Sequence, residues 1–140
     1  MTVHPTLTTA ETNIDFVLTE GTTISGTATD GNGYPIANLT IEANLPGCDW
    51  GTPYQTYTDT NGEYTIVVPP DTGYKVEACV RCDPSVGDFM SEFWDGTDGT
   101  TDCNQSGTVT PTLAIPATGI DFALVQGAHI SGNVTDQNGD

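Results

Sequence analysis

Apolar and polar residues alternate with a period of two along much of the chain. The segments 14–18, 39–45, 64–68 and 74–80 each place an apolar residue at every second position, and in 24–28 Ile24 and Ala28 alternate with Ser25 and Thr27. This alternation is typical of a β-strand that is buried on one face and solvated on the other. No stretch repeats apolar residues at helical spacing over a useful length. The pattern therefore predicts strands and almost no helix.

Turn-forming residues separate these segments at regular intervals. The clusters are Asp-Gly-Asn-Gly at 30–33, Thr-Asn-Gly at 60–62, Pro-Pro-Asp-Thr-Gly at 69–73 and Gln-Asn-Gly at 137–139. Gly and Asn adopt the positive φ angles that tight hairpins require. Short strands at this spacing predict an all-β fold, a seven-stranded antiparallel sandwich. Residues 84–106 break the rhythm, and we expect them to form an ordered surface loop.

The two ends of the chain repeat one another. The segment TVHPTLTTAETNIDFVLTEGTTISGTATDGNG begins at Thr2, and TVTPTLAIPATGIDFALVQGAHISGNVTDQNG begins at Thr108. Asp15 matches Asp121, so the period is about 106 residues. We expect residues 22–126 to form one complete sandwich. Residues 1–21 are then the last strand region of a preceding or exchanged repeat, and 127–140 the first strand of the next, as in a piece of a tandem array.

Several segments within the predicted repeat resemble a known family. The runs ISGTATDGNGYPIANLTIEA, TYTDTNGEYTIVVPP and GYKVEA closely resemble carboxypeptidase regulatory-like domains, which have a transthyretin-like seven-stranded sandwich. The segments SEFWDGTDG and GIDFALVQG are similar to the rest of that pattern. The resemblance implies an accessory or repeating extracellular module. The related B-type domains of collagen adhesins often join a first-strand Lys to Asn or Asp. Here residues 24–30 contain no Lys, and Lys75 is expected to face solvent.

The charge balance excludes several partners. The chain has 19 acidic and 2 basic residues and a formal net charge of -17. Nucleic acids and anionic membrane surfaces are bound through clusters of Lys and Arg, which this chain lacks. The longest apolar run is too short to span a bilayer. We therefore expect no nucleic-acid binding and no membrane insertion. The family resemblance implies an extracellular or cell-surface location.

The four cysteines, Cys48, Cys79, Cys82 and Cys103, predict two disulfides in an extracellular β-domain. Strand alternation would point Cys79 and Cys82 to opposite faces. We therefore expect each of them to pair with Cys48 or Cys103. Free thiols, a redox C-x-x-C pair and a metal site are the alternatives. The redox alternative expects a helix N-terminus, which the pattern does not predict.

Calcium is the most plausible cofactor because acidic and amide oxygens gather in Gly-rich turns. None of these turns fits the calcium-loop pattern, and Asp, Asn and Gly are also ordinary turn formers. The candidate ligands are Asp95, Asp98 and Asp102 in one loop, Asp30 with Asn32, and Asp59 with Asn61.

Catalytic motifs are not found: no Ser lies in a G-x-S-x-G elbow, and the carboxylates on strands are mostly expected to face solvent. Trp50, Tyr54 and Trp94 could form a platform for carbohydrate, although loop aromatics more often make a small core beneath the loop.

The sequence favours a non-enzymatic extracellular structural repeat of a surface protein, stalk or filament. Neighbouring copies of the repeat would be its partners, joined by strand exchange. The alternative is a carbohydrate- or protein-binding accessory module of a secreted enzyme.

Overall fold

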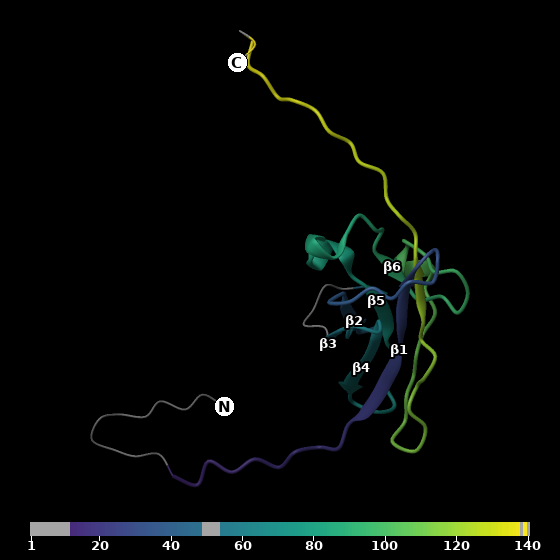
Figure 1. Cartoon of the computed structure of the whole chain (residues 1–140). Coiled ribbons are helices and arrows are strands. Elements are labelled where there is room, and N and C mark those ends of the chain that lie inside the picture. The colour runs from purple at the N-terminus through teal and green to yellow at the C-terminus, as the bar shows by residue number, and fades with distance from the viewer. Residues whose placement is uncertain (1–11, 49–53, 138, 140) are drawn as a thin grey trace.

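The computed structural model describes residues 12–48, 54–137 and 139, and in it two β-sheets pack together (Figure 1). One sheet has three strands in the order β4-β1-β7, and the other has four in the order β3-β2-β5-β6. The predicted all-β sandwich of seven strands is confirmed at this level. The strands are β1 (Thr22–Asp30), β2 (Thr40–Asn44), β3 (Tyr54–Tyr57), β4 (Glu63–Val68), β5 (Lys75–Ala78), β6 (Glu92–Phe93) and β7 (Phe122–Leu124).

The core lies between the two sheets and follows the predicted alternation. In β4, the side chains of Tyr64, Ile66 and Val68 are buried, whereas the intervening residues are exposed. Burying one large apolar side chain contributes about 1.5–3 kcal/mol. Both sheets supply the core, which includes Ile24, Ala28, Leu39, Ile41, Ala43, Tyr74, Val76, Ala78, Phe122 and Leu124.

Strand β1 lies at the centre of the three-stranded sheet. It pairs antiparallel with β4 and parallel with β7, where Ala28 lies opposite Phe122. The prediction of antiparallel pairing throughout is wrong at β7, because this strand returns through a long connection rather than a hairpin. Gly26 permits the close approach: a Cβ there would lie 2.0 Å from the carbonyl oxygen of Ile120. The hydroxyl of Tyr64 donates to the same oxygen at 2.5 Å.

Helical structure is limited to three short 3-10 helices within the described residues, Val80–Cys82, Pro84–Val86 and Cys103–Gln105. None of the helices in the described ranges is long and apolar enough to cross a membrane. All three lie between β5 and β7, in or next to the predicted loop at 84–106. The loop is ordered by reciprocal backbone hydrogen bonds between Phe93 and Thr100, at 2.7 and 3.0 Å.

Extended segments leave the sandwich at its two opposite ends (Figure 1). Residues 12–21 precede β1, residues 128–137 follow β7, and both segments are exposed and outside any strand. The opposite exits follow from the parallel pairing of the first and last strands, since the start of β1 and the end of β7 then lie at different ends of the sheet.

Candidate functional site

The face of the four-stranded sheet turned away from the core carries two buried carboxylates. Glu42 of β2 lies opposite Glu77 of β5 in the strand register, and directly opposed residues share one face. Only 9% of Glu42 and none of Glu77 is exposed. The expectation that strand carboxylates face solvent is wrong here, because the chain that follows β5 folds back over this face. We call this surface the covered face.

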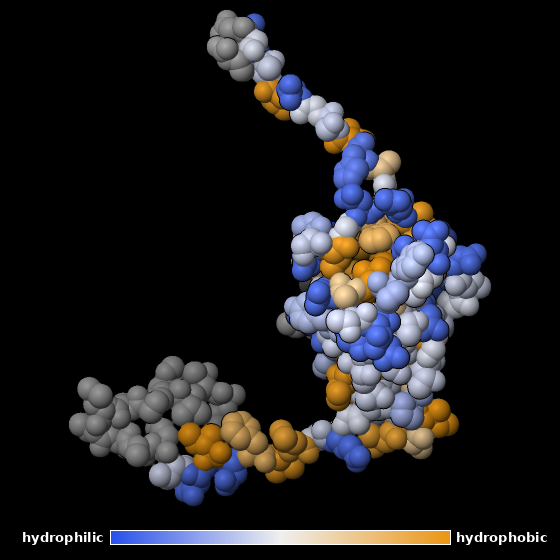
Figure 2. All heavy atoms as spheres, in the orientation of Figure 1, coloured by the Kyte–Doolittle hydropathy of each residue, from blue (hydrophilic) through white to orange (hydrophobic). Residues whose placement is uncertain are grey.

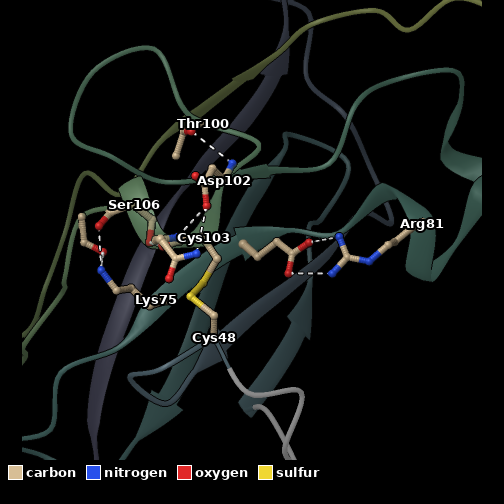
Figure 3. Close-up of a disulfide and its surroundings, with 10 residues drawn as sticks. Cys48, Lys75, Arg81, Thr100, Asp102, Cys103 and Ser106 are labelled. Carbon is tan, nitrogen blue, oxygen red and sulfur yellow. Dashed lines mark hydrogen bonds and ion pairs between the residues drawn. A yellow bond between two sulfur atoms is a disulfide. The ribbon is translucent and has the colours of Figure 1, made fainter.

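Arg81 reaches onto the covered face from the 3-10 helix after β5. Its guanidinium donates two hydrogen bonds to the carboxylate of Glu77; one joins Nη2 to Oε2 at 3.1 Å and the other joins Nη1 to Oε1 (Figure 3). Burial raises the pKa of Glu77, and the neighbouring Glu42 raises it further, while Arg81 opposes both. The guanidinium side chain is 46% exposed, so a half-solvated cation compensates a fully buried anion.

The disulfides differ from the predicted pairing. Cys48 joins Cys103, and Cys79 joins Cys82, whose Cα atoms lie 5.4 Å apart. The prediction extended strand alternation through Cys82. Strand β5 ends at Ala78, and the 3-10 helix then turns the chain so that both side chains converge. The hydrogen bond from the amide of Cys82 to the carbonyl of Cys79, at 3.2 Å, closes this turn.

The Cys79–Cys82 disulfide lies against Glu42. Oε1 of Glu42 is 3.6 Å from Sγ of Cys82, and this is a contact because a bridged sulfur has no proton to donate. The possible ligand atoms of Glu42, Cys79 and Cys82 all lie within 4.8 Å of one another. Within residues 12–48, 54–137 and 139, no other group of three or more His, Cys, Asp or Glu side chains converges in this way.

Lys75 and the other disulfide fasten a loop to the covered face. The ammonium group of Lys75 donates to the carbonyl oxygens of Ser106 and Gly107, at 2.6 and 3.3 Å. The expectation that Lys75 faces solvent is therefore wrong, because the loop lies over it. Cys48–Cys103 holds the same loop from the end of β2 (Figure 3).

Glu92 of β6 is a third buried carboxylate, and its exposed fraction is 5%. Its Oε1 accepts a hydrogen bond from the amide of Val125 at 3.3 Å. Its Oε2 is buried without a hydrogen-bond partner among the residues that the structure describes. Burial raises the pKa of Glu92, the Val125 amide opposes the shift, and the charge of Asp95 adds to it. An unsatisfied buried oxygen favours the neutral carboxyl.

The predicted calcium ligands serve as turn supports. In each case one carboxylate oxygen, Oδ1, accepts hydrogen bonds from backbone amides of the same turn. Asp30 accepts from Asn32 and Tyr34, and Asp59 accepts from Asn61 and Glu63. Asp95 accepts from Thr97 and Gly99, and Asp102 accepts from Asn104. These amides lower the pKa of Asp30 and of Asp95. Asp98 lies exposed in the same loop as Asp95. Within the described ranges no three carboxylates converge, and calcium binding stays a prediction.

The predicted aromatic platform is not assembled by the described residues. Tyr54 lies on the edge strand β3, where its ring meets Tyr74 edge-on with 6.0 Å between the ring centroids. Trp94 follows β6 at the opposite edge, is partly buried and packs against the core. Trp50 lies outside the described residues.

Sequence reasoning missed the carboxylates of the covered face. A usable signal existed: Arg81 is one of only two basic residues, stands four positions after Glu77 and lies inside the Cys79–Cys82 spacing. When a chain has so few basic residues, one that lies four positions from a glutamate and between two cysteines indicates a local ion pair.

Comparisons with known proteins add little to this geometry. No protein-family model matches the chain, and no curated protein matches it. Among solved structures, a crystal structure of a 9R-lipoxygenase from Cyanothece is similar to 81% of this chain, at 16% identity and a TM-score of 0.34. The chain spans 18% of the lipoxygenase chain. A likeness at this level carries no argument about function.

Proposed function

We propose that this chain is a non-enzymatic extracellular structural repeat of a surface protein, stalk or filament. The observation that carries the proposal is the parallel pairing of β1 with β7. Because of it the chain enters the sandwich at one end and leaves at the other (Figure 1). Consecutive copies joined in this way extend along one axis, whereas antiparallel end strands would bring both termini to the same end.

The spacing of the sequence repeat supports a stiff rod. Strand β7 ends at Leu124, and a shift of about 106 residues starts the next first strand at Ala128, so three residues join the two. Three residues span at most about 10 Å. The nine residues of β1 span about 30 Å. One repeat therefore advances the rod by about 40 Å, with little freedom at each joint.

Disulfides and surface charge support an extracellular location. Two disulfides are present, and such bonds persist in oxidising compartments outside the cytosol. A net charge of -17 keeps an exposed polymer soluble and resists lateral association.

The exposed segment before β1 supports strand exchange between copies. Residues 14–18 have the sequence Ile-Asp-Phe-Val-Leu, and residues 120–124 have Ile-Asp-Phe-Ala-Leu. Phe16 and Leu18 are 82% and 89% exposed, and Figure 2 shows apolar side chains along the extended segment that leads to β1. The equivalent Phe122 and Leu124 are buried in the core of the sandwich. We propose that this segment takes the place of β7 in another copy.

Asp121 explains how such an exchange would keep its register. Its Oδ1 accepts the amide of Thr27 at 2.8 Å and the hydroxyl of Thr27 at 3.0 Å. Asp15 occupies the equivalent position in the exposed segment. A shift by one residue would turn Asp15 into the core and Phe16 outward, so the register is strongly specified.

The oligomeric state of the full chain tests the exchange. Size-exclusion chromatography with light scattering should show concentration-dependent oligomers that Phe16→Ser abolishes. Val17→Ser is the matched control, because the equivalent Ala123 is exposed in β7. Oligomers that survive Phe16→Ser, or a wild-type chain that stays monomeric, would contradict exchange. The rod is tested separately by electron microscopy of three repeats in tandem, which should measure about 120 Å in length.

A further inference from the structure

We propose that Cys79, Cys82 and Glu42 form a redox-gated site for a thiophilic divalent cation, with Zn²⁺ as the ion that fits. When the disulfide is closed, the sulfurs are not thiolates and the site is shut. When it is reduced, two thiolates and one carboxylate face a single position. This proposal does not depend on the chain being a structural repeat.

The distance between the carboxylate of Glu42 and Cys82 agrees with tetrahedral zinc coordination. Zinc binds sulfur at about 2.3 Å and carboxylate oxygen at about 2.0 Å, which places the two ligand atoms about 3.5 Å apart. Oε1 of Glu42 lies 3.6 Å from Sγ of Cys82. The C-x-x-C spacing of Cys79 and Cys82 is the one that recurs in structural zinc sites.

The backbone holds these ligands independently of the sulfur–sulfur bond. The amide of Cys79 donates to the carbonyl of Thr40 on β2 at 2.8 Å, two residues before Glu42. The turn itself is closed by the hydrogen bond from Cys82 to Cys79. Glu42 lies on a strand that is paired on both sides, with β3 and with β5. Opening the disulfide therefore leaves the backbone of the three residues in place. The two sulfurs, which are 2.00 Å apart in the bond, then rotate to the separation of about 3.8 Å that zinc requires.

The local charges favour a dication once the site is open. Glu42 and Glu77 are opposed carboxylates on the covered face, and Arg81 pairs with Glu77. The carboxylate of Glu42 meanwhile lies with its Oε1 3.6 Å from Sγ of Cys82. Cys79 is fully buried, whereas Cys82 is exposed and gives access.

The chemistry balances with a small-molecule thiol as the reductant. Two thiol molecules transfer two electrons and two protons to the disulfide, which becomes two cysteine thiols while the reductant becomes a disulfide. Binding of Zn²⁺ releases the two thiol protons to solvent and forms two zinc–sulfur bonds and one zinc–oxygen bond. Water fills the fourth position on the exposed side.

The two disulfides should be reduced one after the other as reductant is added. Cys82 is exposed, whereas Cys48 and Cys103 are both partly buried. A reductant attacks an accessible sulfur faster than a partly buried one. Limited reductant should therefore open Cys79–Cys82 first.

Cobalt titration of the full chain tests the site. The chain is treated with one equivalent of a phosphine reductant without oxygen, and alkylation with peptide mass mapping identifies the free thiols. We expect free Cys79 and Cys82 and one Co²⁺ per chain, with a thiolate-to-cobalt charge-transfer band that Zn²⁺ abolishes. The oxidised chain should show no band. Glu42→Gln should weaken cobalt binding by at least about tenfold.

Two controls keep the test decisive. The double variant Cys79→Ser, Cys82→Ser retains the other disulfide and should give no band after the same treatment. Circular dichroism checks the fold of each variant, and Glu42→Asp replaces Glu42→Gln if the latter fails to fold. The proposal is overturned if the reduced chain binds no cobalt through thiolate, if the double-Ser variant keeps the band, or if both Glu42 variants bind as tightly as the wild type.

Discussion

Replacing Arg81 by Met isolates the energetic role of the cation on the covered face. The substitution keeps the aliphatic part of the side chain and removes the charge that faces the fully buried Glu77. Removing one partner from a fully buried pair costs about 3–5 kcal/mol, whereas exposed pairs contribute at most about 1 kcal/mol. Arg81 is 46% exposed, so water partly replaces it. We expect a loss of about 1–3 kcal/mol at pH 7, or roughly 4 °C of unfolding midpoint for each kcal/mol.

The loss should depend on pH in a defined direction. The folded-state pKa of Glu77 is raised by burial above its ordinary value of 4.5. The folded protein therefore binds the proton more readily than the unfolded chain, and stability is gained as the pH falls through the folded pKa toward 4.5. Arg81→Met raises this pKa further, because the cation that opposed the shift is gone. The difference between variant and wild type should be largest near pH 8 and should shrink as the pH approaches 4.5.

Urea unfolding from pH 8 to pH 4.5 measures this difference. Arg81→Lys is the matched control, because it keeps the charge but loses the two-pronged hydrogen bond, and it should lose less stability. In a Glu77→Gln background, Arg81→Met should cost less than it does in the wild type. A loss that stays constant with pH, or that is undiminished in the Glu77→Gln background, would refute the assignment of Glu77 as a charged partner of Arg81.

Three further predictions concern β7 and the disulfide between the loops. Tyr64→Phe removes the hydrogen bond to Ile120 and should cost about 1 kcal/mol in urea unfolding; an unchanged midpoint would contradict it. Gly26→Ala places a Cβ against the backbone of Ile120, so it should cost more than the roughly 1–3 kcal/mol of ordinary overpacking and release β7 to hydrogen exchange. Joint replacement of Cys48 and Cys103 by Ser removes a cross-link over a separation of 55 residues and should cost about 4 kcal/mol in thermal unfolding; a loss below about 1 kcal/mol would show that the cross-link constrains little.

Alternation predicted the fold correctly where one face of a strand meets water. Strand β4 is the clearest case, because its six residues alternate between exposed and buried. The same rule failed in β2, where all five residues are buried. The apolar Ile41 and Ala43 do face the core. Glu42 also becomes buried, because distant parts of the chain cover the other face, and sequence periodicity carries no information about the path of that covering chain.

The cysteine pairing failed for a related reason. The alternation that holds in β5 was extended past Ala78, where the strand ends. The 3-10 helix Val80–Cys82 follows, and it turns the side chain of Cys82 toward Cys79 rather than to the opposite face. Element boundaries are the weakest part of pattern reasoning. Here one boundary decides between the observed pairing and the two connectivities that alternation allowed, and it creates the contact of Cys82 with Glu42.

The parallel pairing of β1 with β7 also determines how the domain bears tension. A pull on the two ends of the chain draws β1 and β7 past each other along their length. The hydrogen bonds that hold β1 to the segment leading into β7, such as Ile120 to Ser25 at 3.1 Å and Ala117 to Thr23 at 3.0 Å, are then loaded together in shear. An antiparallel pair pulled from adjacent ends would open one bond at a time. In the proposed tandem array, each sandwich would therefore resist stretching along the axis of the rod.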